Sequence, residues 1–258
     1  MREKYAVITG ASSGIGREFA KQLSTKGYSL ILVASRKEYL IELKNELNCY
    51  CEIIVADLSL EEECYHLYEI IQNKNIELLI NNAGFGDFGL FVNGDLQKEM
   101  NMIDVNIKAV QILTKLVLQD MYKKNAGSIL NIASFAGLVP AGPYMSTYYA
   151  SKAYVTSLTQ AIAQELKEHH SDVYIGCLCP GPVDTEFHHV ANVEFALKGI
   201  SAITCVNYAL KMMKRRKTVI VPSIQMKLAM TFGRFLPRRL YIEIISHQQK
   251  KKTNIKRR

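Results

Sequence analysis

Residues 5–16 read YAVITGASSGIG, a short apolar run followed by a turn with glycines at positions 10, 14 and 16. The run ends at Thr9, and after the turn apolar residues recur at helical spacing through Leu23. Glycine lets a backbone bend sharply and come close to an anion, and a helix N-terminus presents free N–H donors to it. This strand, turn and helix therefore predict a dinucleotide site, with a tight turn that needs only permissive residues as the alternative.

Outward from this stretch, short apolar runs alternate with amphipathic segments, which is typical of βα units around a parallel sheet. The runs are almost continuously apolar, as expected for strands covered on both faces. They are Tyr5–Thr9, Leu30–Ala34, Glu52–Ala56, Leu78–Asn81, Ser128–Ala133, Val173–Leu178 and Thr218–Val221. Long helices are expected at about 96–124 and 147–169. Residues 1–222 are thus predicted to form one α/β domain of the doubly wound Rossmann type. Its parallel seven-stranded sheet has the order 3-2-1-4-5-6-7, with right-handed crossovers and helices on both faces.

The composition, with 48% hydrophobic and 22% charged residues, is that of an ordinary globular protein. No signal-peptide core precedes the first strand, and no apolar run has the length of a membrane span, so a cytoplasmic location is expected. The six cysteines lack metal-ligand spacing and are expected to be buried and reduced. The adjacent His188 and His189 have no supporting carboxylates, so no metal site is predicted.

The net charge of +8 is concentrated at the C-terminal end. Residues 227–258 carry ten Lys or Arg and one acid, Glu243, whereas the preceding 226 residues carry 22 basic and 23 acidic side chains. Residues 223–258 are therefore predicted to be a basic amphipathic extension with a disordered end. Such a segment can lie on an anionic membrane. Alternatively, its apolar face closes the substrate pocket or packs against a partner subunit, which is the interpretation we favour. Nucleic acid is not expected as a partner, because the basic residues are interspersed with aliphatic ones and do not belong to a folded nucleic-acid recognition element.

Tyr148 and Lys152 lie four residues apart on a predicted helix and therefore share one face, with Cβ atoms about 5–6 Å apart. An ammonium in that position favours the phenolate, so a phenol with an ordinary pKa of about 10 becomes a usable acid or base near neutrality. Proton transfer to or from a substrate is the chemistry this pair predicts, with a simple surface pair as the alternative.

Taken in order, these features resemble the single-domain type of the short-chain dehydrogenase/reductase family over about residues 5–222. The resemblance rests on Thr9–Gly16, Asn81-Asn82-Ala83-Gly84, Asn106, Ser134, Tyr148, Lys152 and Pro180-Gly181. It implies that Tyr148 donates a proton in reduction and accepts one in oxidation. It also implies that Lys152 holds the cofactor ribose and lowers the tyrosine pKa, that Ser134 orients the substrate oxygen, and that Asn106 holds a water linking the lysine to solvent.

The resemblance implies cofactor contacts at successive strand ends, with Asp57 and Leu58 at the adenine and Thr185 at the nicotinamide carboxamide. The expected cofactor residues are Gly10, Ser12, Ser13, Gly14, Ile15, Gly16, Ser35, Arg36, Asp57, Leu58, Asn82, Ala83, Gly84, Tyr148, Lys152, Pro180, Gly181, Val183 and Thr185. At the end of the second strand, Ser35 and Arg36 replace the acid that would bind a ribose 2′-hydroxyl. NADP is therefore predicted over NAD, unless Arg36 is only a solvated start to the next helix.

The substrate pocket is expected over the carboxyl ends of the strands. Its predicted lining is Ser134, Phe135, Tyr144, Met145, Tyr149 and Phe187. The mostly apolar lining suggests an apolar carbonyl or secondary alcohol such as a hydroxysteroid, although aromatic residues that pack under a lid would look the same. The loop from Ser134 to Tyr148 is about one residue longer than is common in the family, and a turn at Gly142-Pro143 is expected to absorb the difference.

The leading hypothesis is an NADP(H)-dependent oxidoreductase that interconverts a carbonyl and a secondary alcohol on an apolar molecule. The alternatives are a 3-oxoacyl-thioester reductase, whose basic tail would meet an acidic carrier protein, and a non-catalytic NADP-binding regulator. Family habit implies a homodimer or homotetramer assembled through the two longest helices.

Overall fold

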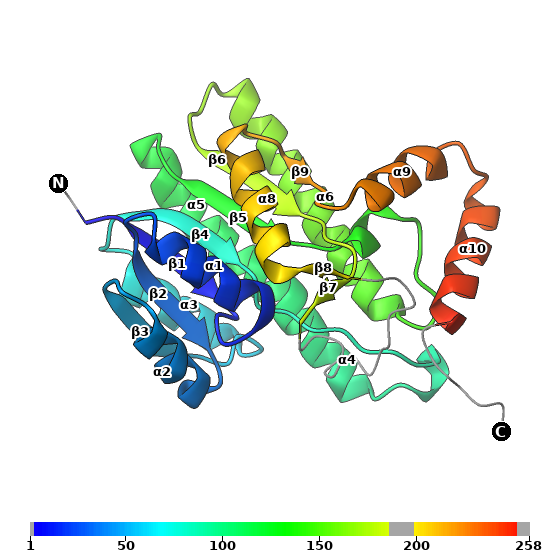
Figure 1. The fold of residues 1–258 in the computed structure, drawn as a ribbon, viewed down its shortest axis with the longest axis horizontal. Coiled ribbons are helices and arrows are strands. Elements are labelled where there is room, and N and C mark those ends of the chain that lie inside the picture. Colours follow the sequence, from blue (N-terminus) through cyan, green and yellow to red (C-terminus); the bar gives the residue numbers. More distant parts are fainter. Residues whose placement is uncertain (1–2, 186–198, 252–258) are drawn as a thin grey trace.

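The computed structural model describes residues 3–185 and 199–251. In this part of the chain, seven parallel strands form one sheet in the order β3-β2-β1-β4-β5-β6-β9 (Figure 1). The strands are β1 (Tyr5–Thr9), β2 (Ser29–Ala34), β3 (Cys51–Val55), β4 (Ile76–Asn81), β5 (Ser128–Ile132), β6 (Tyr174–Leu178) and β9 (Val219–Ile220). The predicted order is confirmed, and each strand lies within two residues of its predicted bounds. A separate parallel pair, β7 (Val183–Asp184) and β8 (Ile200–Ser201), follows β6.

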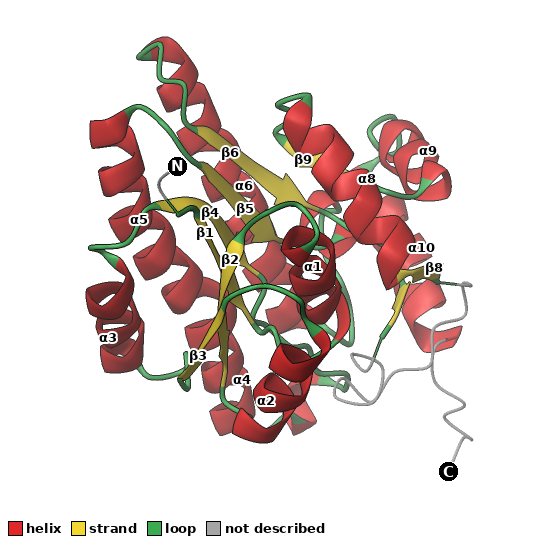
Figure 2. Ribbon diagram, turned by 60° about the vertical axis from the view of Figure 1, so that its left-hand side comes forward, coloured by secondary structure: helices red, strands yellow, loops and turns green. Residues whose placement is uncertain are grey.

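Two layers of helices cover the sheet, because alternate residues of each strand point to opposite faces. In β1, Ala6 and Ile8 join the core on one face and Val7 the core on the other. The first face is covered by α1 (Gly14–Ser24), α2 (Lys37–Glu46) and α8 (Ala202–Lys214). The second is covered by α3 (Glu61–Ile71), α5 (Val110–Lys124) and α6 (Ser146–Glu168), and Figure 2 shows the strands between the two layers.

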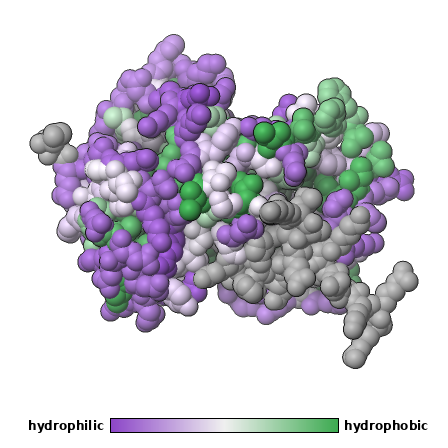
Figure 3. Space-filling model, in the orientation of Figure 1, coloured by the Kyte–Doolittle hydropathy of each residue, from purple (hydrophilic) through white to green (hydrophobic). Residues whose placement is uncertain are grey.

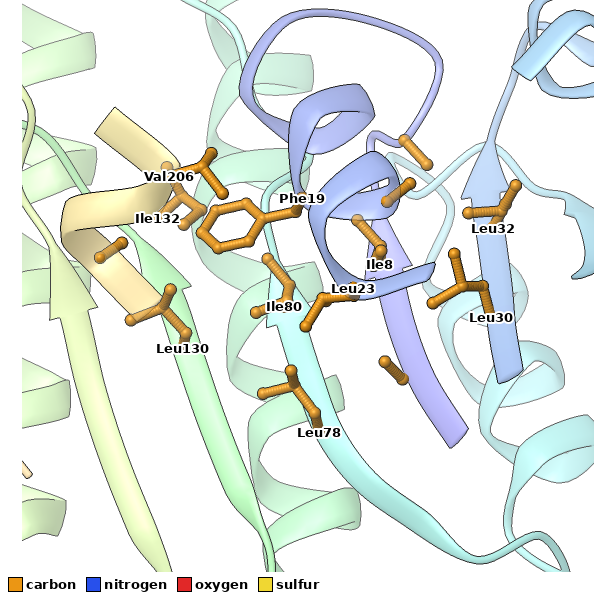
Figure 4. Close-up of a cluster of buried hydrophobic side chains, with 14 of the residues drawn as sticks. Ile8, Phe19, Leu23, Leu30, Leu32, Leu78, Ile80, Leu130, Ile132 and Val206 are labelled. Atoms are coloured by element: carbon orange, nitrogen blue, oxygen red, sulfur yellow. The ribbon is translucent and has the colours of Figure 1, made fainter. Parts of the chain in front are cut away.

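Helix α1 is held to the sheet by its buried side chains. Phe19 and Leu23 are almost completely buried and point toward Ile8, Ile80 and other side chains of the central strands (Figure 4). Full burial of such a side chain stabilises the fold by about 1.5–3 kcal/mol. This packing fixes the N-terminus of α1 beside the carboxyl end of β1.

The segment predicted as one helix at 96–124 is interrupted. It consists of α4 (Leu96–Ile103), a π-helical stretch (Asp104–Ala109) and α5. The apolar repeat runs through all three parts, so the prediction missed the wider turn that carries Asn106. Such π-helical turns are frequent at functional sites. Short 3-10 helices occur at Phe91–Asn93 and Phe135–Leu138.

Two helices follow the last strand, α9 (Ile224–Gly233) and α10 (Arg238–Lys251), and they lie on the β9 side of the molecule (Figure 1). The predicted extension thus forms two helices joined by a turn at residues 234–237, and its expected disordered end at 252–258 lies outside the described residues. Among the helices of the described residues, none combines the length and the apolar character needed to cross a bilayer.

Candidate active site

A cleft of about 860 Å³ runs along the carboxyl ends of the central strands. Residues just after β1, β2, β3, β4, β5 and β6 line it, which is where open parallel sheets bind ligands. Its lining includes Gly10, Ser12, Ser13, Gly14, Ile15, Ser35, Arg36, Asp57, Leu58, Asn82, Ala83, Gly84, Tyr148, Lys152, Pro180, Gly181, Val183 and Thr185. These are all of the predicted cofactor residues except Gly16. Of the predicted substrate residues, Ser134, Phe135, Met145 and Tyr149 line the same cleft.

The glycine turn after β1 is built against the loop after β4. Gly10 has a φ of +61°, and a Cβ there would lie 2.9 Å from the Cα atom of Ala83. The side-chain amide of Asn82 donates to the carbonyl oxygens of Thr9 and Gly10, both at 3.0 Å. A Cβ on Gly16 would lie 2.3 Å from the Gly10 oxygen. Gly16 therefore permits close packing behind the turn and does not line the cleft, and its part in cofactor binding stays a prediction.

The N-terminus of α1 suits an anion. Its N-cap residue, Ser13, makes no side-chain capping hydrogen bond, and the first turn contains no acidic residue. No capping side chain therefore accepts a hydrogen bond from the first-turn amides, and no acidic side chain in the first turn offsets the positive end of the helix dipole. Gly14, with a φ of +54°, packs against Thr185 on the far side of the cleft. These features fit the pyrophosphate of a dinucleotide.

The end of the cleft near β2 and β3 carries charged groups. The Asp57 carboxylate is oriented by Ser59, which donates to it from the backbone N–H at 3.0 Å and from the hydroxyl at 2.8 Å. The Arg36 guanidinium lies 4.2 Å from the centre of the Tyr39 ring, and its Nη2 atom is 3.5 Å from the Ser12 hydroxyl. Arg36 is thus held at the rim of the cleft by its aromatic neighbour.

Ser134, Tyr148 and Lys152 come together as predicted. The Ser134 side chain hydrogen-bonds the Tyr148 phenol, and its oxygen also accepts from the Ala136 amide at 3.1 Å. Lys152 lies 5.9 Å from the centre of the Tyr148 ring and donates to the carbonyl oxygen of Ile132 at 2.9 Å. Helix α6 supplies the tyrosine and the lysine, and the loop after β5 supplies the serine.

Burial controls the ionisation of this group. It raises the pKa of Tyr148 to about 12, although the Ser134 hydrogen bond acts in the opposite direction. It also lowers the pKa of Lys152 to about 8. The predicted lowering of the tyrosine pKa by Lys152 is therefore not found in this structure, because desolvation dominates and the ammonium points to the Ile132 carbonyl. A phenol protonated at neutral pH suits a proton donor.

Asn106 is completely buried but does not line the cleft. Its side-chain oxygen accepts from the Phe85 amide at 3.1 Å, and its nitrogen donates to the Phe85 carbonyl at 2.9 Å and to the Ser151 hydroxyl at 3.0 Å. The Ser151 hydroxyl in turn donates to the carbonyl oxygen of Tyr148 at 2.7 Å. Asn106 thus joins the loop after β4 to the helix that carries Tyr148, and in this structure it positions the site.

The turn expected at Gly142-Pro143 is present, with the Met145 amide donating to the Gly142 carbonyl at 3.0 Å. Tyr144 adopts a left-handed φ of 68° and stacks on Phe88, with ring centres 5.8 Å apart. It does not line the cleft, because this turn directs the ring onto Phe88, and its contact with substrate stays a prediction. The remaining predicted substrate residue, Phe187, lies outside the described residues, as do His188 and His189.

One wall of the cleft was predicted only as the apolar face of the C-terminal extension, and its cleft-lining residues were not predicted one by one. It consists of Met226 and Ala229 from α9 and Tyr241, Ile244, Ile245, Gln248 and Gln249 from α10. Gln249 is 1% exposed, and its side-chain nitrogen donates to the Tyr149 hydroxyl. One face of the C-terminal helices therefore lines the cleft, as expected if the extension closes the pocket, while its packing against a partner subunit stays a prediction. The signal was present as cleft-facing residues at helical spacing from Tyr241 to Gln249.

Comparison with known proteins agrees with this geometry. A family model described as short chain dehydrogenase matches residues 4–194. An uncharacterized oxidoreductase of Staphylococcus epidermidis is 32% identical over 187 residues, which cover 72% of this chain and 80% of the relative. A very-long-chain 3-oxoacyl-CoA reductase of Kluyveromyces lactis is 37% identical over 66% of this chain, which spans only 52% of that reductase.

Two solved structures are similar over nearly the whole chain. A short-chain dehydrogenase from Sphingobium yanoikuyae in complex with NADPH has a TM-score of 0.80 and 29% identity, with coverage of 90% of this chain and 93% of the other. A bulky-bulky ketone specific alcohol dehydrogenase from Comamonas testosteroni has a TM-score of 0.76 and 27% identity, with coverage of 91% and 93%.

Proposed function

Because the chain belongs to the short-chain dehydrogenase family and is an oxidoreductase, we propose that it uses NADP(H) to interconvert a carbonyl and a secondary alcohol on a bulky apolar molecule. One observation carries the proposal. The hydrogen-bonded Ser134 and Tyr148 lie in a cleft that has the glycine turn at one end and the apolar wall of α9 and α10 at the other.

NADPH, when bound, supplies a hydride to the carbonyl carbon. Tyr148 donates its proton to the carbonyl oxygen; the phenol is protonated at neutral pH, and burial raises its pKa further, to about 12. The Ser134 hydroxyl orients that oxygen by a hydrogen bond. Lys152 is still largely protonated at pH 7, since its pKa is about 8, and is the cation that holds the cofactor ribose. In the oxidation direction, the deprotonated form of Tyr148 would accept the proton of the alcohol.

The preference for NADP rests on the rim residues after β2. Ser35 and Arg36 line the cleft there, and no acidic side chain stands at either position. A guanidinium binds phosphate through strong charge-assisted hydrogen bonds, whereas a carboxylate would repel it. The similar dehydrogenase from Sphingobium yanoikuyae, which binds NADPH, is consistent with this preference.

The substrate class rests on the walls. Phe135, Met145, Ile244 and Ile245 offer apolar contact, and the cleft is large enough for a bulky molecule. The similar alcohol dehydrogenase from Comamonas testosteroni is specific for bulky-bulky ketones, which supports the same class. Hydroxysteroid-like molecules and bulky aromatic ketones are the first candidates.

A 3-oxoacyl thioester is the second candidate substrate. Among the relatives described above, the very-long-chain 3-oxoacyl-CoA reductase has the highest identity to this chain. In this reading, the apolar wall of α9 and α10 would hold the acyl chain, while Ser134 and Tyr148 act on the 3-oxo group.

The test is nicotinamide absorbance with the purified full chain, NADPH or NADH, and a panel of ketosteroids, bulky aromatic ketones and 3-oxoacyl-CoA thioesters. We expect turnover with NADPH, and the best substrate separates the two candidates. Tyr148→Phe should lower kcat by about 10²- to 10⁴-fold. Tyr154→Phe is the matched control, since Tyr154 lies on the same helix but is exposed and does not line the cleft.

Three outcomes would count against the proposal. Equal activity of wild type and Tyr148→Phe would contradict the assignment of Tyr148 as the proton donor. A higher kcat/KM with NADH than with NADPH would contradict the proposed preference for NADP. Tight NADPH binding with no turnover on any panel member would favour the non-catalytic regulator. We also propose a homodimer or homotetramer through the two longest helices, α5 and α6, and sedimentation velocity would test it.

A further inference from the structure

Helices α9 and α10 carry apolar side chains on two sides. One side packs inward or lines the cleft, as Met226 and Ile245 do. The other side is an exposed stripe that the cleft does not use. The apolar stripe consists of Ile224, Leu228, Phe232, Phe235, Leu236 and Leu240, with exposed fractions from 36% at Leu236 to 83% at Phe235. The first three lie four residues apart, so they share one face of α9.

The stripe forms a hydrophobic surface rather than a set of scattered side chains. Figure 3 shows hydrophobic residues gathered over α9 and α10, whereas the surface over α1 and α2 is mainly hydrophilic. Single exposed hydrophobic residues are ordinary, but a contiguous patch marks a contact with a partner or a membrane.

Basic residues flank the stripe. Arg234, Arg238 and Arg239 are exposed and lie in the same stretch of chain as Phe235 and Leu236. The acid at this end, Glu243, pairs with Arg239 at 3.3 Å, with both side chains largely exposed. From residue 227 to 258, ten basic residues stand against that one acid. The stripe therefore lies in a strongly positive stretch of the chain.

This charge opposes self-association through the stripe. A two-fold interface brings the same patch of both copies together, so the three arginines of one copy would face those of the other with one Glu243 per copy to offset them. An anionic lipid surface offers the complementary chemistry, since phosphate and carboxylate headgroups meet the arginines and the acyl boundary accepts the phenylalanines.

We infer that the α9–α10 surface docks on an anionic membrane, with the apolar stripe at the boundary between headgroups and acyl chains. The two helices would lie on the membrane surface without crossing the bilayer. This membrane contact is separate from the proposed reaction. The same two helices form a wall of the cleft, and Ile244 both lines the cleft and is 42% exposed. Docking would therefore place one wall of the cleft beside the lipid, in which the apolar substrate of the proposed function, on which this last point rests, would dissolve.

Vesicle flotation of the full chain tests the inference without cofactor or substrate, so its failure says nothing against the reaction. We expect binding to vesicles of phosphatidylcholine mixed with phosphatidylserine at low salt, weaker binding to phosphatidylcholine alone, and loss of binding at high salt. Arg234→Gln, Arg238→Gln and Arg239→Gln together should weaken partitioning about a hundredfold, since each nearby charge contributes roughly fivefold.

Phe232→Gln with Phe235→Gln should weaken binding at least about tenfold, because both rings would leave the acyl boundary. Tyr50→Gln is the matched control. Tyr50 is an aromatic residue of 58% exposure that directly precedes β3, at the amino ends of the strands and away from the cleft, and its change should leave binding unaltered. All these positions are exposed, so thermal unfolding of the variants should match that of wild type.

Absence of flotation at low salt would overturn the inference, and so would equal binding by wild type and the two-phenylalanine variant. A wild-type dimer that dissociates when Phe232 and Phe235 are changed would assign the stripe to a second copy of the chain instead. Binding that depends on anionic lipid, on the arginines and on the phenylalanines together would establish the membrane contact.

Discussion

Asn106→Leu should destabilise the protein by about 3 kcal/mol, although the residue does not touch the cleft. Leucine is similar in size to asparagine, so the change removes hydrogen bonds and opens little space. It leaves the Phe85 N–H and carbonyl, now bonded at 3.1 and 2.9 Å, without their partner. Each such group costs roughly 1–3 kcal/mol, and the half-buried position of Phe85 places the cost in the lower part of that range. A loss of about 3 kcal/mol corresponds to a fall in Tm of roughly 6–12 °C for a domain of this size.

Urea and thermal unfolding measure this change. Asn101→Leu is the control, because its side chain accepts a hydrogen bond from Gln97 at the surface of the same helix region, and it should cost no more than about 0.5 kcal/mol. A Tm of Asn106→Leu within about 2 °C of wild type would refute the reasoning that Asn106 holds the loop after β4 in place. The pH profile of activity separates this positioning role from the expected water-holding role, since only loss of a proton path would change its shape.

Three further changes test the cleft. Arg36→Asp should lower kcat/KM for NADPH by at least about tenfold and leave NADH unharmed, and an unchanged ratio of the two values would refute the rim assignment. Burial lowers the pKa of Lys152 from 10.5 to about 8. Between pH 8 and 10.5 the lysine is therefore protonated in the unfolded chain but neutral in the folded one, so the free energy of unfolding rises with pH. Relative to Lys152→Met, the stability of wild type should rise by about 3 kcal/mol over this range. Below pH 8 Lys152 is protonated in both the folded and the unfolded chain, so no further change is expected there. A difference in unfolding free energy between wild type and Lys152→Met that does not vary with pH would contradict the lowered pKa. Gln249→Leu should cost about 1–2 kcal/mol by orphaning the Tyr149 hydroxyl, while the same change in a Tyr149→Phe background should cost little. If urea unfolding shows that the double variant loses the sum of the stability losses of the two single variants, the hydrogen bond between Gln249 and Tyr149 is contradicted.

The strands were predictable because each is a short apolar run buried on both faces. In β1, residues 5–9 were predicted to the residue, since the glycine turn that follows them ends the strand. The π-helical stretch at Asp104–Ala109 was not predictable, because the apolar repeat continues through it and a wider hydrogen-bonded turn leaves no mark in composition.

Positions within turns were predicted less well than their neighbours. Gly10 and Gly14 line the cleft as expected, whereas Gly16 faces back onto the Gly10 carbonyl. Tyr144 was expected to line a substrate pocket over the carboxyl ends of the strands. Its left-handed backbone turns the ring onto Phe88 instead, and side-chain direction in a turn depends on the backbone angles rather than on sequence distance.

Chemistry that depends on neighbours a few residues apart could be read from the chain alone. The glycine turn and the Tyr148–Lys152 pair are of this kind, because helix and turn geometry relate such residues directly. The ionisation of the pair and the far wall of the cleft could not be read in this way. Burial by distant segments raises one pKa and lowers the other, and Gln249 reaches Tyr149 across 100 residues of sequence. Desolvation and long-range contact follow from how the whole chain packs, and no local pattern records them.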